Sequence, residues 1–267
     1  MAESIVIVSG LSGVFGQQLS SSLMKVGIGI KGLMRDSQDD WINSLYELSS
    51  DMELSDSLLI HAAIPQSPRS KLARETYVYS TEKLFNACKQ MHIKLVFVSS
   101  LSVHSKNYST YAREKAYLEN LAHSYGFQVV RIGLLDSQIE GSALQKALTE
   151  IGNNFILKAL FRHSRREYYF TSATEIQNLV FDLKSGKNFG PLSYVANSSP
   201  FYLSKKEKMK TSRHNVFYEY PRDRKEPIIF DLLLRLLAKL HNPRLDTFVS
   251  FASGMSLFSK DGETLAR

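Results

Sequence analysis

The sequence predicts an α/β fold in which a doubly wound parallel sheet, covered by helices on both faces, is followed by a small C-terminal lobe. Short apolar runs alternate with helical patterns through the first half of the chain. The runs are nearly continuous in hydrophobicity, as expected of strands buried on both faces. After about residue 136 this alternation loosens. We therefore expect a sheet domain over residues 1–150 and a smaller lobe over 151–267 that is interleaved with the sheet rather than independent.

Five strands are expected in the first half. The apolar runs that predict them cover residues 4–10, 27–34, 57–64, 93–100 and 127–135. Apolar residues at helical spacing connect them, through Leu19, Leu23 and Val26 and over residues 76–91 and 108–126.

The remaining parts of the chain give weaker signals. The stretch between Arg35 and Ile60 is brief, which indicates a shortened strand and helix. A strand-like run covers residues 166–176, and a helix is expected over residues 227–240, after a basic region at 201–225.

Composition narrows the class of protein. A chain of 267 residues can bury a substantial core. Its single cysteine, Cys88, excludes an internal disulfide and a cysteine-rich zinc site, and we expect a reducing, cytoplasmic setting. The N-terminal apolar stretch is too short to span a membrane and lacks the features of a secretory signal, so no membrane insertion is expected.

A glycine-rich turn follows the first expected strand. In "SGLSGVFGQQL", Gly10, Gly13 and Gly16 stand between an apolar run and a helical pattern. This context is typical of a dinucleotide site, where glycines allow a tight turn, a close approach to the pyrophosphate and close helix packing. A glycine-rich turn without a ligand is the alternative.

The residue after the second strand bears on the choice of cofactor. NAD-binding proteins usually place a carboxylate there, whereas this chain has Met34 and then Arg35. An arginine can receive the 2′-phosphate of NADP. We therefore expect NADP, with NAD remaining possible, and the alternative is a solvated arginine at a strand end.

Polar side chains stand at the end of the fourth strand and on the helix that follows it. That strand ends in Ser99 and Ser100, and the next helix carries Tyr111 and Lys115 four residues apart. Ligands bind at the carboxyl edge of open α/β sheets. A hydroxyl, a phenol and an ammonium there can serve proton transfer, although a tyrosine and a lysine at this spacing also occur as plain helix neighbours.

These pieces resemble the short-chain dehydrogenase/reductase superfamily, and within it the extended branch of NAD(P)-dependent nucleotide-sugar epimerases, dehydratases and reductases, which share a Rossmann-type fold. The matching segments, in the family's order over roughly residues 4 to 135, are "GLSGVFG", "LLIHAAI", "TEKLFNAC", "FVSSLSV" and "YAREK".

The resemblance implies a set of site residues and partners. Ser100, Tyr111 and Lys115 would be catalytic, with Lys115 also contacting the nicotinamide ribose. The cofactor would contact Gly10, Leu11, Ser12, Gly13, Val14, Phe15, Gly16, Arg35, Ala62, Ala63 and Ile64. The substrate would be a nucleotide sugar, and a homodimer is compatible with the family. The sequence itself shows no metal-binding cluster and no RNA-binding motif around its aromatic residues, so no metal or nucleic acid is expected.

The sequence also departs from the family pattern. Val103, His104 and Ser105 replace the Val-Tyr-Gly that often follows the serine strand. Tyr77 stands where the family has an asparagine, and Ser80 where it has a glycine. A proton relay through that asparagine is therefore in doubt, and a non-catalytic NADP-binding regulatory or scaffold protein is the alternative function.

Basic residues gather in the second half and contribute to the net charge of +7. Arg162, Arg165 and Arg166 could hold a diphosphate of the substrate, because the planar guanidinium group binds phosphate through paired hydrogen bonds. A solvated charge run is the alternative for the basic region after residue 200. His61 and His104 are expected to be packing or loop residues, because this chemistry has no role for an imidazole.

Overall fold

The computed structural model describes residues 5–35, 41–54, 57–64, 71–105, 110–136, 169–185 and 192–196. The chain divides into two compact units, which are described separately. The first comprises Met1–Ser99, Glu114–Arg131 and Ile176–Tyr194, and the second comprises Ser100–Arg113, Ile132–Glu175 and Val195–Arg267. The boundary predicted at residue 150 lies outside the described residues, so the division into a domain and a lobe stays a prediction.

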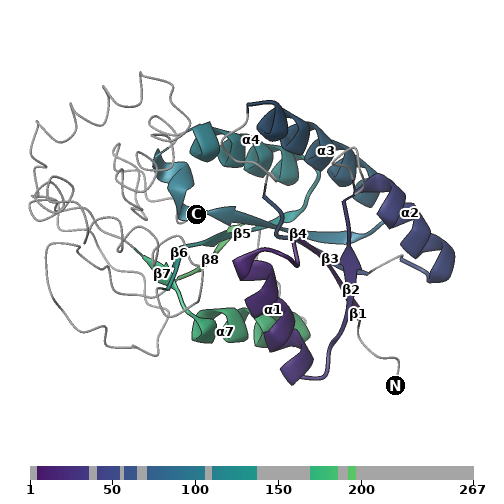
Figure 1. The fold of residues 1–267 in the computed structure, drawn as a ribbon, viewed down its shortest axis with the longest axis horizontal. Helices are drawn as coiled ribbons and strands as arrows, with labels where there is room; N and C mark the ends of the chain where they lie inside the picture. Colours follow the sequence, from purple (N-terminus) through teal and green to yellow (C-terminus); the bar gives the residue numbers. More distant parts are fainter. Residues whose placement is uncertain are drawn as a thin grey trace, which may run out of the picture. The chain divides into compact units, whose positions relative to one another are not determined.

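A six-stranded sheet forms the centre of the fold (Figure 1). Its strands are β1 (Ile5–Ser9), β2 (Gly29–Leu33), β3 (Leu58–His61), β4 (Lys94–Ser100), β5 (Gln128–Ile132) and β8 (Leu192–Val195), in the order β2-β1-β3-β4-β5-β8. β1 pairs in parallel with β2 and β3, and β3 pairs in parallel with β4. Each of the five predicted runs forms a strand, although β5 covers only the first part of the run 127–135, and β8 was missed.

The register places the carboxyl ends of the central strands level with one another. Ser9 of β1 pairs with Leu33 of β2 and His61 of β3, and His61 pairs with Phe97 of β4. The chain order reverses between β1 and β3, which is the point where ligands bind in open α/β sheets.

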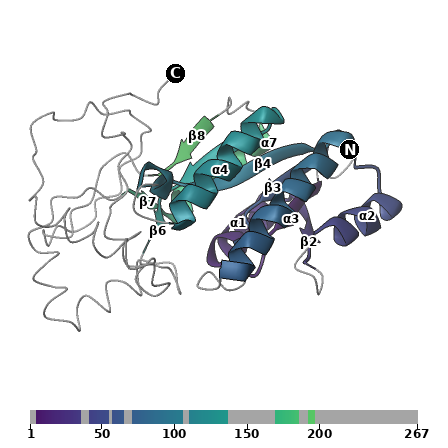
Figure 2. The ribbon, with the colours of Figure 1, turned by 90° about the horizontal axis from the view of Figure 1, so that it is seen from above.

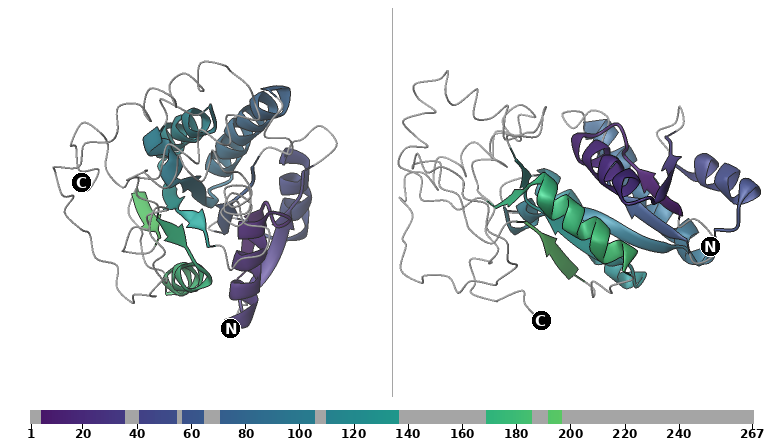
Figure 3. Two further views of the ribbon diagram at one scale, coloured as in Figure 1. Left: turned by 60° about the vertical axis from the view of Figure 1, so that its left-hand side comes forward. Right: turned by 90° about the horizontal axis from the view of Figure 1, so that it is seen from below.

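Helices cover both faces of the sheet, as predicted (Figures 2 and 3). α1 (Val14–Lys25) and α7 (Ala173–Lys184) lie on one face, and α2 (Ile42–Asp51), α3 (Lys71–Gln90) and α4 (Thr110–Ser124) lie on the other. α3 begins earlier than the helix predicted at residue 76, and α2 is the one helix described between β2 and β3. The predicted doubly wound α/β fold is confirmed.

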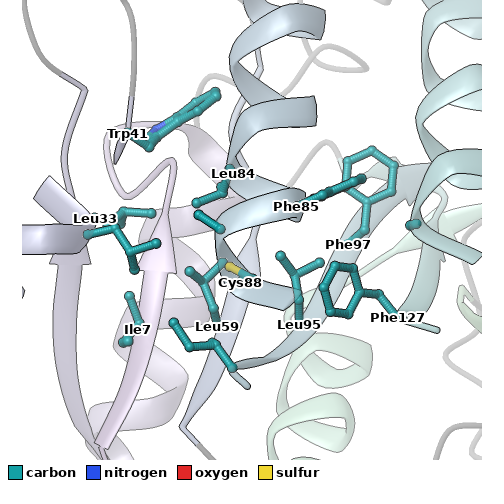
Figure 4. Close-up of a cluster of buried hydrophobic side chains, with 14 of the residues drawn as sticks. Ile7, Leu33, Trp41, Leu59, Leu84, Phe85, Cys88, Leu95, Phe97 and Phe127 are labelled. Atoms are coloured by element: carbon teal, nitrogen blue, oxygen red, sulfur yellow. The ribbon is translucent and has the colours of Figure 1, made fainter. Parts of the chain in front are cut away.

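The core beneath α2, α3 and α4 is apolar and rich in aromatic rings (Figure 4). Alternate residues of the strands face this layer, including Ile7, Leu59, Leu95 and Phe97. α3 contributes Leu84, Phe85 and Cys88. Burial raises the pKa of the Cys88 thiol to about 12, so the thiol packs as a small apolar group.

The second unit differs from the sequence prediction in two places. The run 127–135 forms two strands, because Gly133 separates β5 from β6 (Leu134–Leu135), and β6 pairs in parallel with β7 (Phe170–Thr171) in a second sheet. A Cβ atom at Gly133 would lie 2.4 Å from the carbonyl oxygen of Tyr169, so glycine permits this close approach.

The strand predicted over 166–176 is wrong at its carboxyl end. Within its described part, β7 is two residues long and α7 begins at Ala173. The backbone N–H of Ser172 donates to Oε2 of Glu175 at 2.9 Å, and the N–H of Glu175 donates to Oγ of Ser172 at 3.5 Å. This reciprocal pair is a capping box, which starts a helix.

Candidate functional site

The turn after β1 requires glycine at its first position. Gly10 has a φ of +81°, a left-handed conformation that glycine adopts without steric cost. A Cβ atom at Gly10 would lie 2.7 Å from both Cα and N of Ala63. The loop after β3 therefore packs directly on the turn after β1, and the N–H of Ala62 donates to the carbonyl of Ser9 at 3.2 Å.

The start of α1 is built for close backbone approach. A Cβ atom at Gly16 would lie 2.1 Å from the carbonyl oxygen of Gly10, so only glycine fits there. Gly13 is the N-cap residue and gives no side-chain cap to the first turn, which contains no acidic residue. The N–H groups of this turn are thus positioned to bind an anion.

Leu11, Ser12, Val14 and Phe15 complete the segment that was predicted to contact a cofactor. The carbonyl of Ser12 accepts a hydrogen bond from the side-chain amide of Gln17 at 3.2 Å, and Phe15 is buried. The structure brings this segment together with Ala62 and Ala63, although the binding roles of these residues stay predictions.

Arg35 contacts the loop after β3, the loop that packs on this turn. Its guanidinium group donates to the carbonyl of Ile64 and lies over the Trp41 ring, with Cζ 4.9 Å from the ring centroid. Arg35 follows β2 and Ile64 follows β3, so this bond joins the strands on either side of β1. The selection of NADP by Arg35 stays a prediction.

Lys115 projects from α4 into the core of the first unit, where it is 3% exposed. Its Nζ donates to the hydroxyl of Tyr77 at 3.1 Å and to the carbonyl of Val98 at 3.1 Å. The same nitrogen lies 4.6 Å from the centroid of the Phe97 ring. An amine in this position has two acceptors and an aromatic face, and little water around it.

Burial lowers the pKa of Lys115 to about 7, from 10.5 for an ordinary lysine, against the opposing effect of Glu119 and Glu114. The desolvation of the charged form is the dominant cause. A lysine with such a pKa changes its charge near neutral pH, which is typical of functional sites.

His61 is a packing residue, as predicted. It is buried, its Nδ1 lies 2.7 Å from Oγ of Ser9, and its Nε2 lies 3.3 Å from Oγ1 of Thr81. Burial holds its pKa well below the usual value, and the charges of Lys115 and Arg35 add to this effect. The imidazole is therefore neutral.

Ser100, the last residue of β4, belongs to the second unit and precedes a short 3-10 turn over Leu101–Ser105. Its Oγ accepts a hydrogen bond from the N–H of Ser102 at 3.2 Å, which fixes the hydroxyl oxygen and does not use its hydrogen. Ser102 is fully buried, and its own Oγ has no hydrogen-bond partner among the described residues. Because the hydrogen of the Ser100 hydroxyl is not used in its bond with Ser102, Ser100 can still donate to an oxygen atom of a ligand.

The remaining predicted residues are placed as follows. Tyr111 is partly buried and precedes Lys115 by one turn of α4. The convergence of Ser100, Tyr111 and Lys115 on a substrate stays a prediction. Arg162, Arg165 and Arg166 lie outside the described residues, as do residues 201–225 and 227–240 and the side chain of His104.

The sequence analysis missed the role of Tyr77 in the surroundings of Lys115. Tyr77 was noted only as a departure from the family pattern, yet its hydroxyl is one of two acceptors of the lysine amine. The two residues are 38 positions apart, and no local spacing connects them.

Two further findings concern other kinds of site. In the part of the chain that the structure describes, no three His, Cys, Asp or Glu side chains gather so as to hold a metal ion. Among the same residues, no helix has the length and apolar character needed to cross a membrane.

Comparison by sequence gives no relative, because no protein-family model and no curated protein matches the chain. Comparison by structure gives many. The chain is similar to dTDP-4-dehydrorhamnose reductase from Bacillus anthracis in complex with NADP, at a TM-score of 0.56 and 14% identity, over 74% of this chain and 76% of the other.

Two further solved structures are similar over comparable lengths. dTDP-4-dehydrorhamnose reductase from Yersinia enterocolitica matches at a TM-score of 0.55 and 16% identity, over 75% of this chain and 77% of that one. UDP-N-acetylglucosamine 4-epimerase from Bacillus cereus matches at 0.52 and 18%, over 75% and 82%. The chain therefore has the fold of the extended short-chain dehydrogenases/reductases, as its sequence motifs predicted.

Proposed function

We propose that this protein is an NAD(P)-dependent enzyme of the short-chain dehydrogenase/reductase type, which reduces or epimerises a nucleotide-linked sugar by hydride transfer. The observation that carries the proposal is the state of Lys115. Its amine is buried and its pKa is lowered to about 7, on the helix that presents Tyr111 one turn earlier. Burying an ammonium group costs free energy, so a lysine with a purely structural role is rarely desolvated to this extent.

The first unit fits a dinucleotide. A Cβ atom at Gly10 or Gly16 would clash with backbone atoms, so the tight turn requires glycine at both positions, and the N-terminus of α1 offers N–H groups to a pyrophosphate. Arg35, which contacts the loop after β3, would bind the 2′-phosphate of NADP, and Lys115 would donate to the nicotinamide ribose. When bound, the cofactor supplies or takes up the hydride.

Proton transfer to or from the substrate would be carried out by side chains of the protein. Ser100 would donate a hydrogen bond to the substrate oxygen, and Tyr111 would give that oxygen a proton during reduction or take one during oxidation. A free tyrosine has a pKa near 10, so it needs a neighbouring positive charge to act as a base at neutral pH. The ammonium form of Lys115 would supply this charge.

The substrate class is proposed from the similar structures. Two of them are named for reduction of a dTDP-linked sugar and one for epimerisation of a UDP-linked sugar. Arg162, Arg165 and Arg166 would bind the diphosphate of such a substrate.

The alternative is a non-catalytic NADP-binding regulatory or scaffold protein. Tyr77, in place of the family's asparagine, favours this alternative, because the family's proton relay runs through that position. The two functions predict the same cofactor binding and differ in turnover.

One experiment separates them. Purified protein is titrated with NADP and NAD by calorimetry and then mixed with NADPH and a panel of keto-sugar nucleotides, while NADPH absorbance is followed. Epimerisation of UDP- and dTDP-sugars is followed by NMR. Turnover supports the enzyme, binding without turnover supports the binding protein, and the absence of binding contradicts both.

A further inference from the structure

The hydroxyl of Tyr77 connects two parts of the candidate site within the first unit. It accepts a hydrogen bond from Nζ of Lys115 at 3.1 Å and donates one to the carbonyl of Ala63 at 3.1 Å. Ala63 is the residue that packs against Gly10 in the turn after β1. A chain of two hydrogen bonds therefore runs from the lysine amine to the loop against the glycine turn.

The directions of these hydrogen bonds determine whether the Tyr77 hydroxyl donates to Lys115 or accepts from it. A tyrosine hydroxyl has one hydrogen, and here the carbonyl of Ala63 accepts it. Toward Lys115, the oxygen can present only a lone pair. The carbonyl of Val98 is also an acceptor only, so both partners favour a donating amine.

The ring of Tyr77 is held in place by its neighbours. Tyr77 is 1% exposed, and its ring stacks on His61 at a centroid distance of 6.2 Å and meets Trp41 edge-on at 6.1 Å. The position of the hydroxyl oxygen is therefore fixed by packing, independently of the lysine.

We propose that Tyr77 is a positioning residue, whose hydroxyl oxygen holds the Lys115 amine in place as a hydrogen-bond donor for the chemistry at Tyr111. The proposal rests on the proposed function for its catalytic consequence. In this chain a tyrosine replaces the family's asparagine, and the tyrosine hydroxyl takes the role of holding the lysine amine.

The effect of Tyr77 on the pKa of Lys115 can be separated from the effects of the surrounding charged groups. On α4, Glu114 and Glu119 raise the pKa of Lys115, while each is ion-paired with an arginine, Arg74 at 3.0 Å and Arg131 at 2.6 Å respectively. From β3, His61 faces the same region and is neutral, and the charge of Arg35 also acts on it. Substituting Tyr77 by phenylalanine changes none of these groups.

The first test is a direct titration of Lys115. The ¹⁵Nζ resonance of Lys115 is followed against pH by NMR in the full chain and in Tyr77→Phe, with Lys115→Met for assignment. Loss of one acceptor of a charged donor should move the midpoint down by about one pH unit. Tyr79→Phe is the matched control, because Tyr79 lies on the same helix and is exposed.

An unchanged midpoint in Tyr77→Phe, or an equal movement in Tyr79→Phe, would overturn the proposal. A second measurement needs no variant of Tyr77. In the parent protein, the ¹³Cζ resonance of Tyr77 should titrate with the midpoint of Lys115, because the phenol oxygen accepts from the amine. A resonance that stays constant through that midpoint overturns the proposal even if Tyr77→Phe fails to fold.

The catalytic consequence is tested by turnover. In Tyr77→Phe, kcat near neutral pH should fall about fivefold with little change in substrate KM, and the decline of activity with rising pH should begin about one pH unit earlier. A purely structural role would not move the pH profile. If the parent shows no turnover while the two NMR titrations agree, the proposed function has failed and the hydrogen-bonding role of Tyr77 stands.

Discussion

The glycine turn after β1 and the surroundings of Lys115 are built on opposite principles. The turn depends on side chains that are missing, since a Cβ at Gly10 or Gly16 would lie 2.7 Å or 2.1 Å from backbone atoms. The surroundings of Lys115 depend on side chains that are present, since Tyr77 and Phe97 surround a buried amine together with the carbonyl of Val98.

The two regions differ in how far apart their residues lie in the sequence. Glycines close together in the sequence shape the turn, and its main partner, Ala63, follows the adjacent strand. The surroundings of Lys115 combine residues of α3, β4 and α4 that meet only after the sheet and its helices have assembled. The glycine turn therefore matches the sequence pattern of the family, whereas the surroundings of Lys115 depart from that pattern at Tyr77.

The largest expected effect tests whether the Lys115 helix is catalytic. Tyr111→Phe removes the oxygen that would exchange a proton with the substrate, so turnover should fall by roughly 10²- to 10⁴-fold, with cofactor affinity nearly unchanged. Turnover is followed by NADPH absorbance and affinity by calorimetry. Tyr117→Phe is the control, because Tyr117 is an exposed tyrosine on the same helix. Turnover of Tyr111→Phe at the parent rate would show that Tyr111 and Lys115 are only helix neighbours.

The next prediction concerns the turn. Gly10→Ala should weaken cofactor binding by about tenfold or more, because the new methyl group displaces Ala63 and a left-handed residue is strained by roughly 1–2 kcal/mol. Gly126→Ala is the matched control, since Gly126 has a φ of +79° and open space around its Cβ position.

Calorimetry gives the two affinities, and denaturant unfolding gives the two stabilities. Gly126→Ala should show the loss of stability from backbone strain and keep the parent affinity. Equal affinities in the two variants would mean that the contact of Gly10 with Ala63 has no part in binding.

The third prediction is a dependence of stability on pH. The pKa of Lys115 is about 7 in the folded chain against 10.5 for an ordinary lysine, so above about pH 7 the unfolded chain binds more protons. The free energy of unfolding should therefore rise by about 2 kcal/mol between about pH 7 and about pH 9. At higher pH the rise is opposed by Cys88, whose pKa is raised from 9.0 to about 12 by burial.

Denaturant unfolding at several pH values measures this rise, and Lys115→Met is the comparison. The methionine variant should show no rise over the same interval, because it has no amine to desolvate. A parallel rise in both proteins would assign the effect to another group.

The smallest expected effect concerns the choice of cofactor beside the turn. Arg35→Glu should lower the ratio of NADP to NAD affinity by about tenfold, because a carboxylate repels the 2′-phosphate. Calorimetry with both cofactors measures the ratio. Lys31→Glu, at an exposed position of β2, makes the same change of charge and should leave the ratio near its parent value. Equal losses for both cofactors in Arg35→Glu would mean that Arg35 supports the turn through Ile64 and Trp41 without selecting the cofactor.

Much of the fold could be predicted from local patterns. Parallel strands buried on both faces give continuous apolar runs, which is why β1 to β5 could be located. The start of α7 was also readable, because Ser172 and Glu175 form a capping box that was overlooked. The separation of β5 from β6 was not readable, because it depends on the approach of Tyr169 to Gly133.

By itself, the sequence determined strands β1 to β5, the helices between them and the glycine turn, because each depends on hydrophobic periodicity or on the missing side chain of a nearby residue. Only the tertiary structure decided the state of Lys115. Its low pKa comes from burial, and its two acceptors, Tyr77 and Val98, lie 38 and 17 positions away. Desolvation depends on everything packed around a group, so the chemistry of an amine is set by residues that become its neighbours only when the chain has folded.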